Sequence, residues 1–302
     1  MGPGQVHVRA RCFALNFPDV LITRGQYQIK LDPPFVPGSE LAGEVIAVGE
    51  GVQDVAVGQR VLAMTGFGAF GEEILVSPPM QQVMAIPNSM SFEDAAAFNM
   101  VYGTAMHGLS QRGNLQPEET LLVLGAAGGC GSAAVQIGKA MGARVIAGTS
   151  SEQKCQLARQ FGADEVINYS EVDLRDRTLE LTDGKGVNVV FDPVGDALFR
   201  PALRSLGWNG RYLVIGFAGG DIPQLGINYT IMKSVSVVGV AYGMSAIDDP
   251  AMNAGNFAQL FDWFGQGKLK PHIGKRFALE QMPDALRDMH AGQALGKTII
   301  NA

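Results

Sequence analysis

Cysteine and histidine are scarce in this sequence, and those present do not form a metal-binding pattern. The 302 residues include 3 cysteines and 4 histidines, and no two cysteines form a C-x-x-C pair. Structural zinc sites need four Cys or His ligands at short, regular spacings, which are missing here. Few and unpaired cysteines are also typical of a reducing compartment, so we expect a cytoplasmic protein without disulfides.

Long apolar runs are missing as well. The most apolar stretch, residues 133–148, is interrupted by Lys139 and Arg144, whereas a membrane-spanning helix needs about 20 apolar residues in a row. The first residues also lack the basic and then apolar pattern of a signal peptide. We therefore predict that the protein has no membrane partner.

An excess of positive charge is the third absence. The formal net charge is −6, and the chain shows no cluster of Lys and Arg. Because phosphate neutralisation dominates nucleic-acid affinity, we expect no nucleic-acid partner. A content of 47% hydrophobic and 17% charged residues excludes disorder and supplies enough apolar side chains for two folded domains.

The first 98 residues have the pattern of a small antiparallel sheet. Residues 6–10 alternate apolar and polar side chains, as a half-buried strand does, and residues 43–48 and 60–63 are further strand candidates between Gly- and Pro-rich turns. The last segment, 252–302, predicts helices near 257–264 and 282–289 and a strand at 297–300. We expect this last strand to return to the first domain.

Between these segments, residues 119 to about 240 alternate strands and helices. Ser91 and Asp94 resemble a capping box, which predicts a helix from Ser91 to about Leu109. The predicted strands are 120–124, 143–147, 165–168, 187–192, 211–215 and 235–239, and the predicted helices between them are 131–141, 151–161, 172–181 and 197–206. Repeated strand–helix units of this length indicate an α/β fold with a doubly wound parallel sheet.

A glycine-rich loop joins the first of these strands to its helix. It consists of Ala126, Ala127, Gly128, Gly129, Cys130 and Gly131. In this strand–loop–helix context the pattern predicts a dinucleotide site, in which Gly128 lets the backbone approach a pyrophosphate and Gly131 lets the helix pack closely on the strand. The N-terminus of the helix would hold the phosphate, and Cys130 replaces a small apolar side chain.

The end of the second strand indicates which dinucleotide is bound. Enzymes that use NAD place a carboxylate there, but this segment has Thr149 and Ser150, followed by Lys154. Hydroxyls and a cation suit a 2′-phosphate, and Tyr169 after the third strand adds a phenol. These residues favour NADP(H) as the cofactor, although Lys154 on a solvated helix face would look the same in the sequence.

Segments along almost the whole chain resemble the quinone oxidoreductase branch of the medium-chain dehydrogenase/reductase superfamily. They are residues 14–19, 37–45, 126–131, 162–164, 191–195 and 296–300. The resemblance implies a GroES-like catalytic domain, here 1–98 and 252–302, interrupted by a Rossmann NADP-binding domain, here 99–251. It also implies a dimer. Members of the family carry an opening hairpin ahead of Gly2, and we expect that hairpin to be absent here.

Comparison with the zinc-dependent members of that superfamily predicts a zinc-independent protein. They carry a Gly-His-Glu where this chain has Gly38-Ser39-Glu40, and a cysteine near the position of Asn16. Only Cys12 lies close to that position here. Without a Lewis acid, reduction of an acceptor that is already electrophilic is favoured over alcohol oxidation.

The resemblance also suggests roles for individual residues. Asn16 would hydrogen-bond either the ribose hydroxyls or the acceptor oxygen, and Tyr27 would form an apolar wall or donate a proton. Thr104, Phe217 and Val240 would lie beside the nicotinamide carboxamide, and Lys297 would lie at the pocket edge. Each also has a structural explanation: a turn for Asn16, a loop anchor for Tyr27 and a helix hydrogen bond for Thr104. Glu40 and His107 are read as buried structural residues.

Three functions remain open from the sequence. The first is NADPH-dependent hydride transfer to a quinone or enone, which are small electrophilic acceptors. The second is an enoyl-thioester or 2-alkenal reductase, and the third is a non-catalytic NADPH-binding protein. The apolar strand at 235–240 would be exposed at a sheet edge, so we expect a homodimer joined through it.

Overall fold

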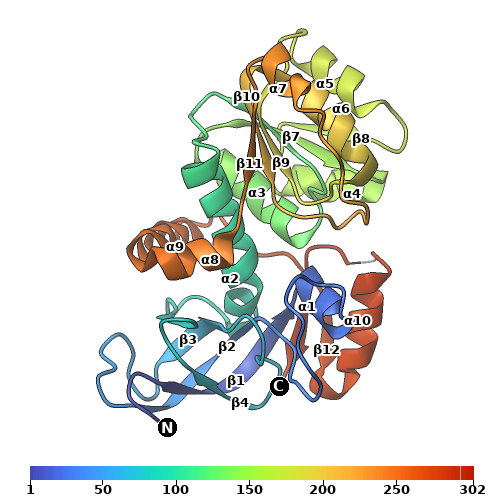
Figure 1. Cartoon of the computed structure of the whole chain (residues 1–302). Coiled ribbons are helices and arrows are strands. Elements are labelled where there is room, and N and C mark those ends of the chain that lie inside the picture. The colour runs from blue at the N-terminus through green and yellow to red at the C-terminus, as the bar shows by residue number, and fades with distance from the viewer. Residues whose placement is uncertain (293) are drawn as a thin grey trace. The chain divides into compact units, whose positions relative to one another are not determined.

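Both ends of the chain contribute strands to one sheet. The computed structural model describes residues 1–292 and 294–302 and divides them into two units (Figure 1). The first unit consists of Met1–Met100, Ser245–Met252 and Lys270–Ala302, and the second of Val101–Met244 and Asn253–Leu269.

The described residues of the first unit form a seven-stranded sheet. Its strands are β1 (Val6–Leu15), β2 (Glu40–Val48), β3 (Arg60–Met64), β4 (Glu73–Val76), β5 (Gln82–Ala85), β12 (Ile273–Ala278) and β13 (Lys297–Asn301). The order is β12-β13-β1-β2-β3-β5, with β4 also paired to β1. β13 runs antiparallel to β1, with Phe13 opposite Ile300. The predicted return of the last strand to the first domain is therefore confirmed.

Alternation of side chains explains how this sheet is packed. In β1, Val6, Val8 and Ala10 are buried on one face, and they join a core that includes Phe13 and Leu41. Two helices belong to the same unit, α1 (Phe17–Thr23) and α10 (Met282–His290), and Ala285 of α10 lies within the core cluster. Burial of one apolar face per strand accounts for the predicted antiparallel pattern.

The second unit contains a parallel sheet of six strands among its described residues. These are β6 (Thr120–Val123), β7 (Arg144–Thr149), β8 (Glu165–Asn168), β9 (Val187–Asp192), β10 (Leu206–Val214) and β11 (Ser236–Gly239). Their order, β11-β10-β9-β6-β7-β8, is the doubly wound arrangement. Successive strands are added on one side of β6 up to β8 and on the other side from β9 onward, so the strand order reverses between β6 and β9. The predicted fold class is confirmed.

The helices that connect these strands are α3 (Gly129–Ala140), α4 (Glu152–Gln160), α5 (Leu174–Leu181), α6 (Phe199–Arg204) and α7 (Asn228–Met232). Before β6 comes α2 (Phe92–His107), and after β11 come α8 (Tyr242–Asp248) and α9 (Pro250–Gly265). The Ser91 hydroxyl accepts a hydrogen bond from the Asp94 N–H at 3.0 Å, so the predicted capping interaction starts α2. The predicted helix 197–206 is shorter, because Leu206 already begins β10.

The segment 253–269 differs from its predicted assignment. We placed it in the catalytic domain, but by its contacts it belongs to the second unit. Two of its asparagines account for this: Asn253 accepts a hydrogen bond from the Tyr242 hydroxyl at 3.2 Å, and Asn256 exchanges hydrogen bonds with Gln111 at 2.9 and 3.1 Å. Such polar contacts cannot be predicted from the spacing of apolar residues in the sequence.

Candidate functional site

The glycine loop of the second unit is built around a close approach of two backbone segments. A Cβ atom on Gly131 would lie 2.2 Å from the Gly125 carbonyl oxygen and 2.8 Å from the Ala126 Cα. Only glycine fits there. The Ala126 N–H donates to the Gly148 carbonyl oxygen at 3.1 Å, which ties the loop to β7. This is the tight helix–strand packing predicted for Gly131.

The loop delivers the N-terminus of α3 to the carboxyl end of β6. Gly128 is the N-cap residue and α3 begins at Gly129. First-turn N–H groups have no acceptor within an α-helix, and the helix dipole favours an anion at this end. Ala127, Gly129 and the half-buried Cys130 complete the turn. The loop therefore fits a pyrophosphate, as its sequence predicts.

Three polar side chains meet just beyond the end of β7. Lys154 Nζ donates to Ser150 Oγ at 3.0 Å, and the Tyr169 ring lies beside the same strand end, 3.6 Å from the position of a Cβ on Gly148. Burial raises the pKa of the Tyr169 phenol, so it stays protonated and able to donate near neutral pH. A cation and two hydroxyls around one point suit a phosphate monoester.

Thr149 differs from the other residues predicted for this group. Its side chain is buried, and its Oγ1 lies 3.0 Å from Cys155 Sγ. The hydroxyl thus faces the interior. Thr149 contributes only its backbone here, where its carbonyl oxygen accepts from the Tyr169 N–H at 3.0 Å.

The residues predicted to lie beside the nicotinamide belong to the carboxyl end of the same sheet. A Cβ on Gly108 would lie 3.6 Å from Val240 Cγ1. Thr104, which is nearly buried, stands four residues earlier on that face of α2. Val240 follows β11, and its N–H donates to the Val214 carbonyl oxygen at 3.0 Å. The contact of Gly108 places the end of α2 beside Val240, and the role of Thr104 at the carboxamide stays a prediction.

His107 follows Thr104 by three residues and is the last residue of α2. Its Nδ1 is 3.3 Å from Gln111 Oε1, and its ring centroid is 6.5 Å from that of Tyr242. Desolvation lowers the pKa of His107, so the ring is neutral near pH 7. This agrees with our reading of His107 as a buried structural histidine.

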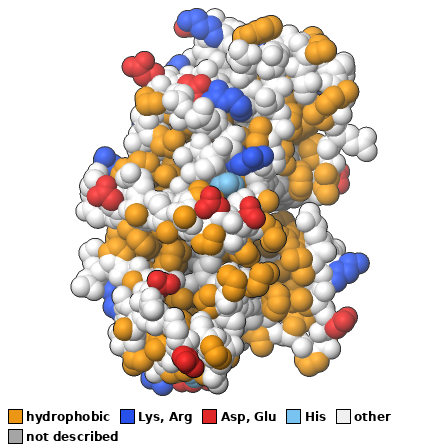
Figure 2. All heavy atoms as spheres, turned by 60° about the vertical axis from the view of Figure 1, so that its left-hand side comes forward, with side chains coloured by type: hydrophobic (Ala, Val, Ile, Leu, Met, Phe, Trp, Pro, Cys, Tyr) orange, Lys and Arg blue, Asp and Glu red, His pale blue; other side chains and the backbone are white. Residues whose placement is uncertain are grey.

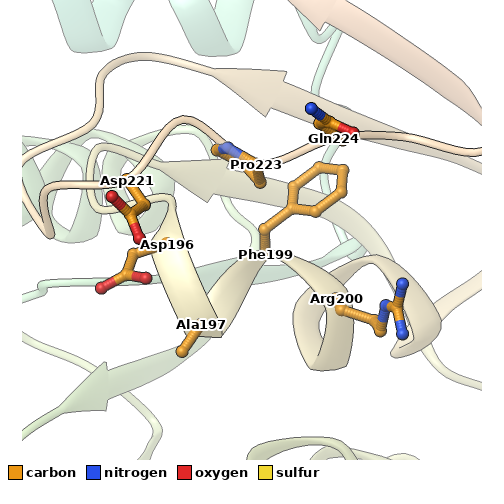
Figure 3. A pocket seen from close by; sticks show the side chains of 7 residues that line it. All are labelled: Asp196, Ala197, Phe199, Arg200, Asp221, Pro223 and Gln224. Carbon is orange, nitrogen blue, oxygen red and sulfur yellow. The ribbon is translucent and has the colours of Figure 1, made fainter.

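A surface pocket of about 420 Å³ lies near the carboxyl ends of β9 and β10. It is lined by Asp196, Ala197, Phe199, Arg200, Asp221, Pro223 and Gln224 (Figure 3). In Figure 3, Asp196 and Asp221 stand on one side and Arg200 on the other. Two neighbouring carboxylates would repel the phosphates of a dinucleotide, so we do not assign the pocket to those phosphates.

Phe217 lines a neighbouring cavity of about 140 Å³ together with Asp192 and Tyr212.

The predicted catalytic residue Asn16 lies in a buried polar cluster of the first unit. Its Nδ2 donates to Glu40 Oε1 at 2.7 Å and to Ser39 Oγ at 3.2 Å. Lys297 Nζ donates to Asn16 Oδ1 at 2.7 Å, to Glu40 Oε1 at 2.9 Å and to the Leu15 carbonyl oxygen at 3.0 Å. Glu40 is buried against polar partners, as we expected. Lys297 is only 4% exposed, so its ammonium lies inside this cluster, and its place at a pocket edge stays a prediction.

Sequence reasoning missed Asp19, the fifth member of this cluster. Its Oδ2 accepts from the Asn16 N–H at 2.8 Å, while its buried Oδ1 has no hydrogen-bond partner among the described residues. Burial raises the pKa of Asp19 to about 7. The signal was available, because an Asn followed three residues later by Asp at the start of a helix resembles a capping box.

Tyr27 lies apart from these hydrogen bonds, half-buried in a bend after α1.

At the position that corresponds to the zinc site of the zinc-dependent members, the charged side chains are paired with each other. Ser39 accepts from Asn16, and Glu40 is neutralised by the Lys297 ammonium. Across the described ranges, no three His, Cys, Asp or Glu residues are grouped so as to hold a metal ion.

Comparison with known proteins assigns the chain to a family. Residues 2–88 match the family model "Alcohol dehydrogenase GroES-like domain", and residues 129–262 match "Zinc-binding dehydrogenase". The quinone oxidoreductase-like protein 2 homolog of Nematostella vectensis is 38% identical over 304 residues, which cover 100% of this chain and 82% of that protein. This chain belongs to the quinone oxidoreductase family of medium-chain dehydrogenases/reductases.

Two solved structures bear on the chemistry of the family. Escherichia coli quinone oxidoreductase complexed with NADPH is 28% identical with a TM-score of 0.91, covering 100% of this chain and 93% of that one. CurK enoyl reductase is also 28% identical, with a TM-score of 0.89 and coverage of 99% and 91%. The first of these structures supports NADP binding by the family fold, and the two together show that the fold is shared by a quinone oxidoreductase and an enoyl reductase.

On the face shown in Figure 2, acidic and basic side chains are interspersed, and hydrophobic side chains lie between them. Every helix in the described part of the chain is too short or too polar to cross a membrane.

Proposed function

We propose that this protein uses NADPH to reduce a quinone or an enone, and that it does so without zinc. The observation that carries the choice of cofactor is the hydrogen bond between Lys154 and Ser150 after β7, where an NAD-dependent enzyme would carry a carboxylate. The E. coli relative that binds NADPH supports this choice.

The two units would divide the work. In the second unit, Ser150, Lys154 and Tyr169 hold the 2′-phosphate, and the N-terminus of α3 holds the pyrophosphate. Thr104 and the backbone at Phe217 and Val240 orient the carboxamide. When bound, the nicotinamide supplies the hydride.

In the first unit, Asn16 and Tyr27 are the residues we assign to the site of reaction. A quinone or enone needs only one proton after it has received the hydride, and water can supply that proton. The absence of a recognised acid–base pair in the sequence is consistent with such an acceptor. The Ser39 hydroxyl and the paired Glu40 and Lys297 are the basis for proposing a zinc-free site.

A second candidate is reduction of an enoyl thioester, which the similarity to CurK enoyl reductase favours. It would use the same cofactor and the same direction of hydride transfer, so only the acceptor distinguishes it. A non-catalytic NADPH-binding protein is the third alternative, and it requires tight binding without turnover.

We also propose that the protein forms a homodimer through β11. This strand lies at one end of the order of the parallel sheet, and Val237 on it is 36% exposed. The preceding α7 places Ile231 at 83% exposure. An apolar edge strand is protected when it pairs with a second copy.

The deciding experiment follows NADPH oxidation by its absorbance, with NADH as the control cofactor. The acceptors are 1,4-benzoquinone, a naphthoquinone, a 2-alkenal and crotonyl-CoA. Quinone turnover with NADPH well above NADH supports the proposal, provided that metal analysis finds no stoichiometric zinc and chelation leaves the rate unchanged. Turnover of the thioester alone selects the second candidate, and binding without turnover selects the third.

A further inference from the structure

Lys297 uses all of its hydrogen-bonding capacity inside the first unit. An ammonium has three donors, and these go to Leu15 O, Asn16 Oδ1 and Glu40 Oε1 at 3.0, 2.7 and 2.9 Å. Its side chain is 5% exposed and that of Glu40 is 0% exposed. The lysine is therefore a fixed internal part of the site.

These contacts determine which way the Asn16 amide faces. An ammonium cannot accept, so the amide oxygen must face Lys297, and an ionised carboxylate cannot donate, so the amide nitrogen must face Glu40. The second N–H of that nitrogen reaches Ser39 Oγ at 3.2 Å. Asn16 thus has no donor left and one lone pair free on its oxygen. It can receive a hydroxyl group, whereas a quinone oxygen, which only accepts, does not fit.

Glu40 is fixed independently of this lysine. Its second oxygen, Oε2, accepts from the backbone N–H of Met100 in α2 at 2.7 Å. One oxygen of this carboxyl group therefore accepts a hydrogen bond from the backbone, and the other accepts one from the Asn16 amide. A group at position 40 must keep an oxygen facing Met100.

We propose that Lys297 and Glu40 are positioning residues, which hold the Asn16 amide with its oxygen available to a hydroxyl of the bound cofactor, and that turnover requires this orientation. The inference rests on the proposed function, in which Asn16 belongs to the reaction site. It concerns residues that were read from the sequence as structural or peripheral.

The double variant Lys297→Met/Glu40→Gln tests it. Removing both charges leaves neither member of the Lys297–Glu40 pair as an unpaired buried ion, so we expect the fold to persist. The introduced glutamine amide must turn its oxygen to Met100 and hence its NH₂ to Asn16, which then presents its own oxygen to that NH₂. The Asn16 amide is reversed. We expect kcat for a quinone at saturating NADPH to fall about 10- to 100-fold, with KM for the quinone within about twofold of wild type.

A double-mutant cycle separates positioning from structure. In an Asn16→Ala background there is no amide to orient, so Lys297→Met/Glu40→Gln should change kcat less than about twofold. The control is Lys275→Met/Asp288→Asn, which removes an ion pair between β12 and α10 of the same unit and should leave kcat unchanged.

Each outcome has one meaning. A stable double variant with low kcat, and no further loss in the Asn16→Ala background, supports the proposal. A stable double variant with wild-type kcat, or an equal loss in both backgrounds, overturns it while the reductase function stands. Absence of turnover by the wild-type protein with every acceptor overturns the proposed function and this inference together. If the double variant unfolds, the positioning role is overturned in favour of a structural one.

Discussion

Lys154 Nζ lies 3.0 Å from Ser150 Oγ, so a cation and a hydroxyl face the same point after β7. If a 2′-phosphate binds there, Lys154→Met removes one charge-assisted contact. We expect the Kd for NADPH to rise about 10- to 100-fold, while the Kd for NADH, which has no such phosphate, stays constant. Fluorescence titration measures both constants. Lys185→Met, at an exposed lysine of the same unit, is the control, and an equal loss of NADH affinity would contradict the assignment.

Gly131→Ala should destabilise the second unit and its dinucleotide site. The added methyl group would lie 2.2 Å from the Gly125 carbonyl oxygen, and the backbone must move to relieve this contact. We expect a loss of about 1–3 kcal/mol in the free energy of unfolding and weaker NADPH binding. Gly255→Ala is the matched control, since nothing lies within 4 Å of its added Cβ in α9. It should raise stability by about 0.5–1 kcal/mol, and two similar results in denaturant titrations would refute the packing argument.

Asp19 should make stability depend on pH near neutrality. Burial raises the pKa of this carboxyl group from 3.8 to about 7, with Lys297 lowering it and Glu40 raising it by their charges. Between those pH values the folded chain keeps a proton that the unfolded chain has lost. The contribution of Asp19 to stability is therefore full below about pH 4 and is lost as pH rises through about 7.

The variant Asp19→Asn isolates this contribution, because its amide does not ionise. We expect the Tm of the variant relative to wild type to increase steadily from pH 4 to pH 8, measured by scanning calorimetry in one salt concentration. A difference in Tm that does not change with pH would show that Asp19 is ionised throughout.

Val237→Lys should separate the proposed dimer into monomers. A charged side chain on an edge strand opposes its pairing with another strand, and Val237 stands on β11 with 36% exposure. Sedimentation equilibrium should show twice the chain mass of 32.0 kDa for wild type and one chain mass for the variant. A wild-type protein that sediments as a monomer would end the dimer proposal.

The fold was predictable because its signals are local. Residues 165–168 and 187–192 were predicted as strands with the bounds that β8 and β9 have, since each is a short, mainly apolar segment bounded by turns. The predicted helix ends were less accurate. α2 continues at Gly108 into a π-helical turn that ends at Arg112, and the pattern of apolar residues does not indicate this change.

The candidate site was predictable only where it follows one strand. Ser150, Lys154 and Tyr169 lie within 20 residues of one another and were predicted together. The cluster around Asn16 was not, because Glu40 and Lys297 are 257 residues apart in the chain. Their pairing follows from the sheet order, which places β13 next to β1, and no local pattern encodes it.

The position of β13 has a consequence for how the protein is made. β13 lies between β12 and β1, and β1 has been synthesised long before Lys297 leaves the ribosome. The second unit, which includes no residue beyond Leu269, is complete before then, whereas Cys12–Leu15 of β1 lack their partner strand until β13 arrives. Residues 6–9 of β1 pair with β4, so only the second half of this strand edge depends on the arrival of β13.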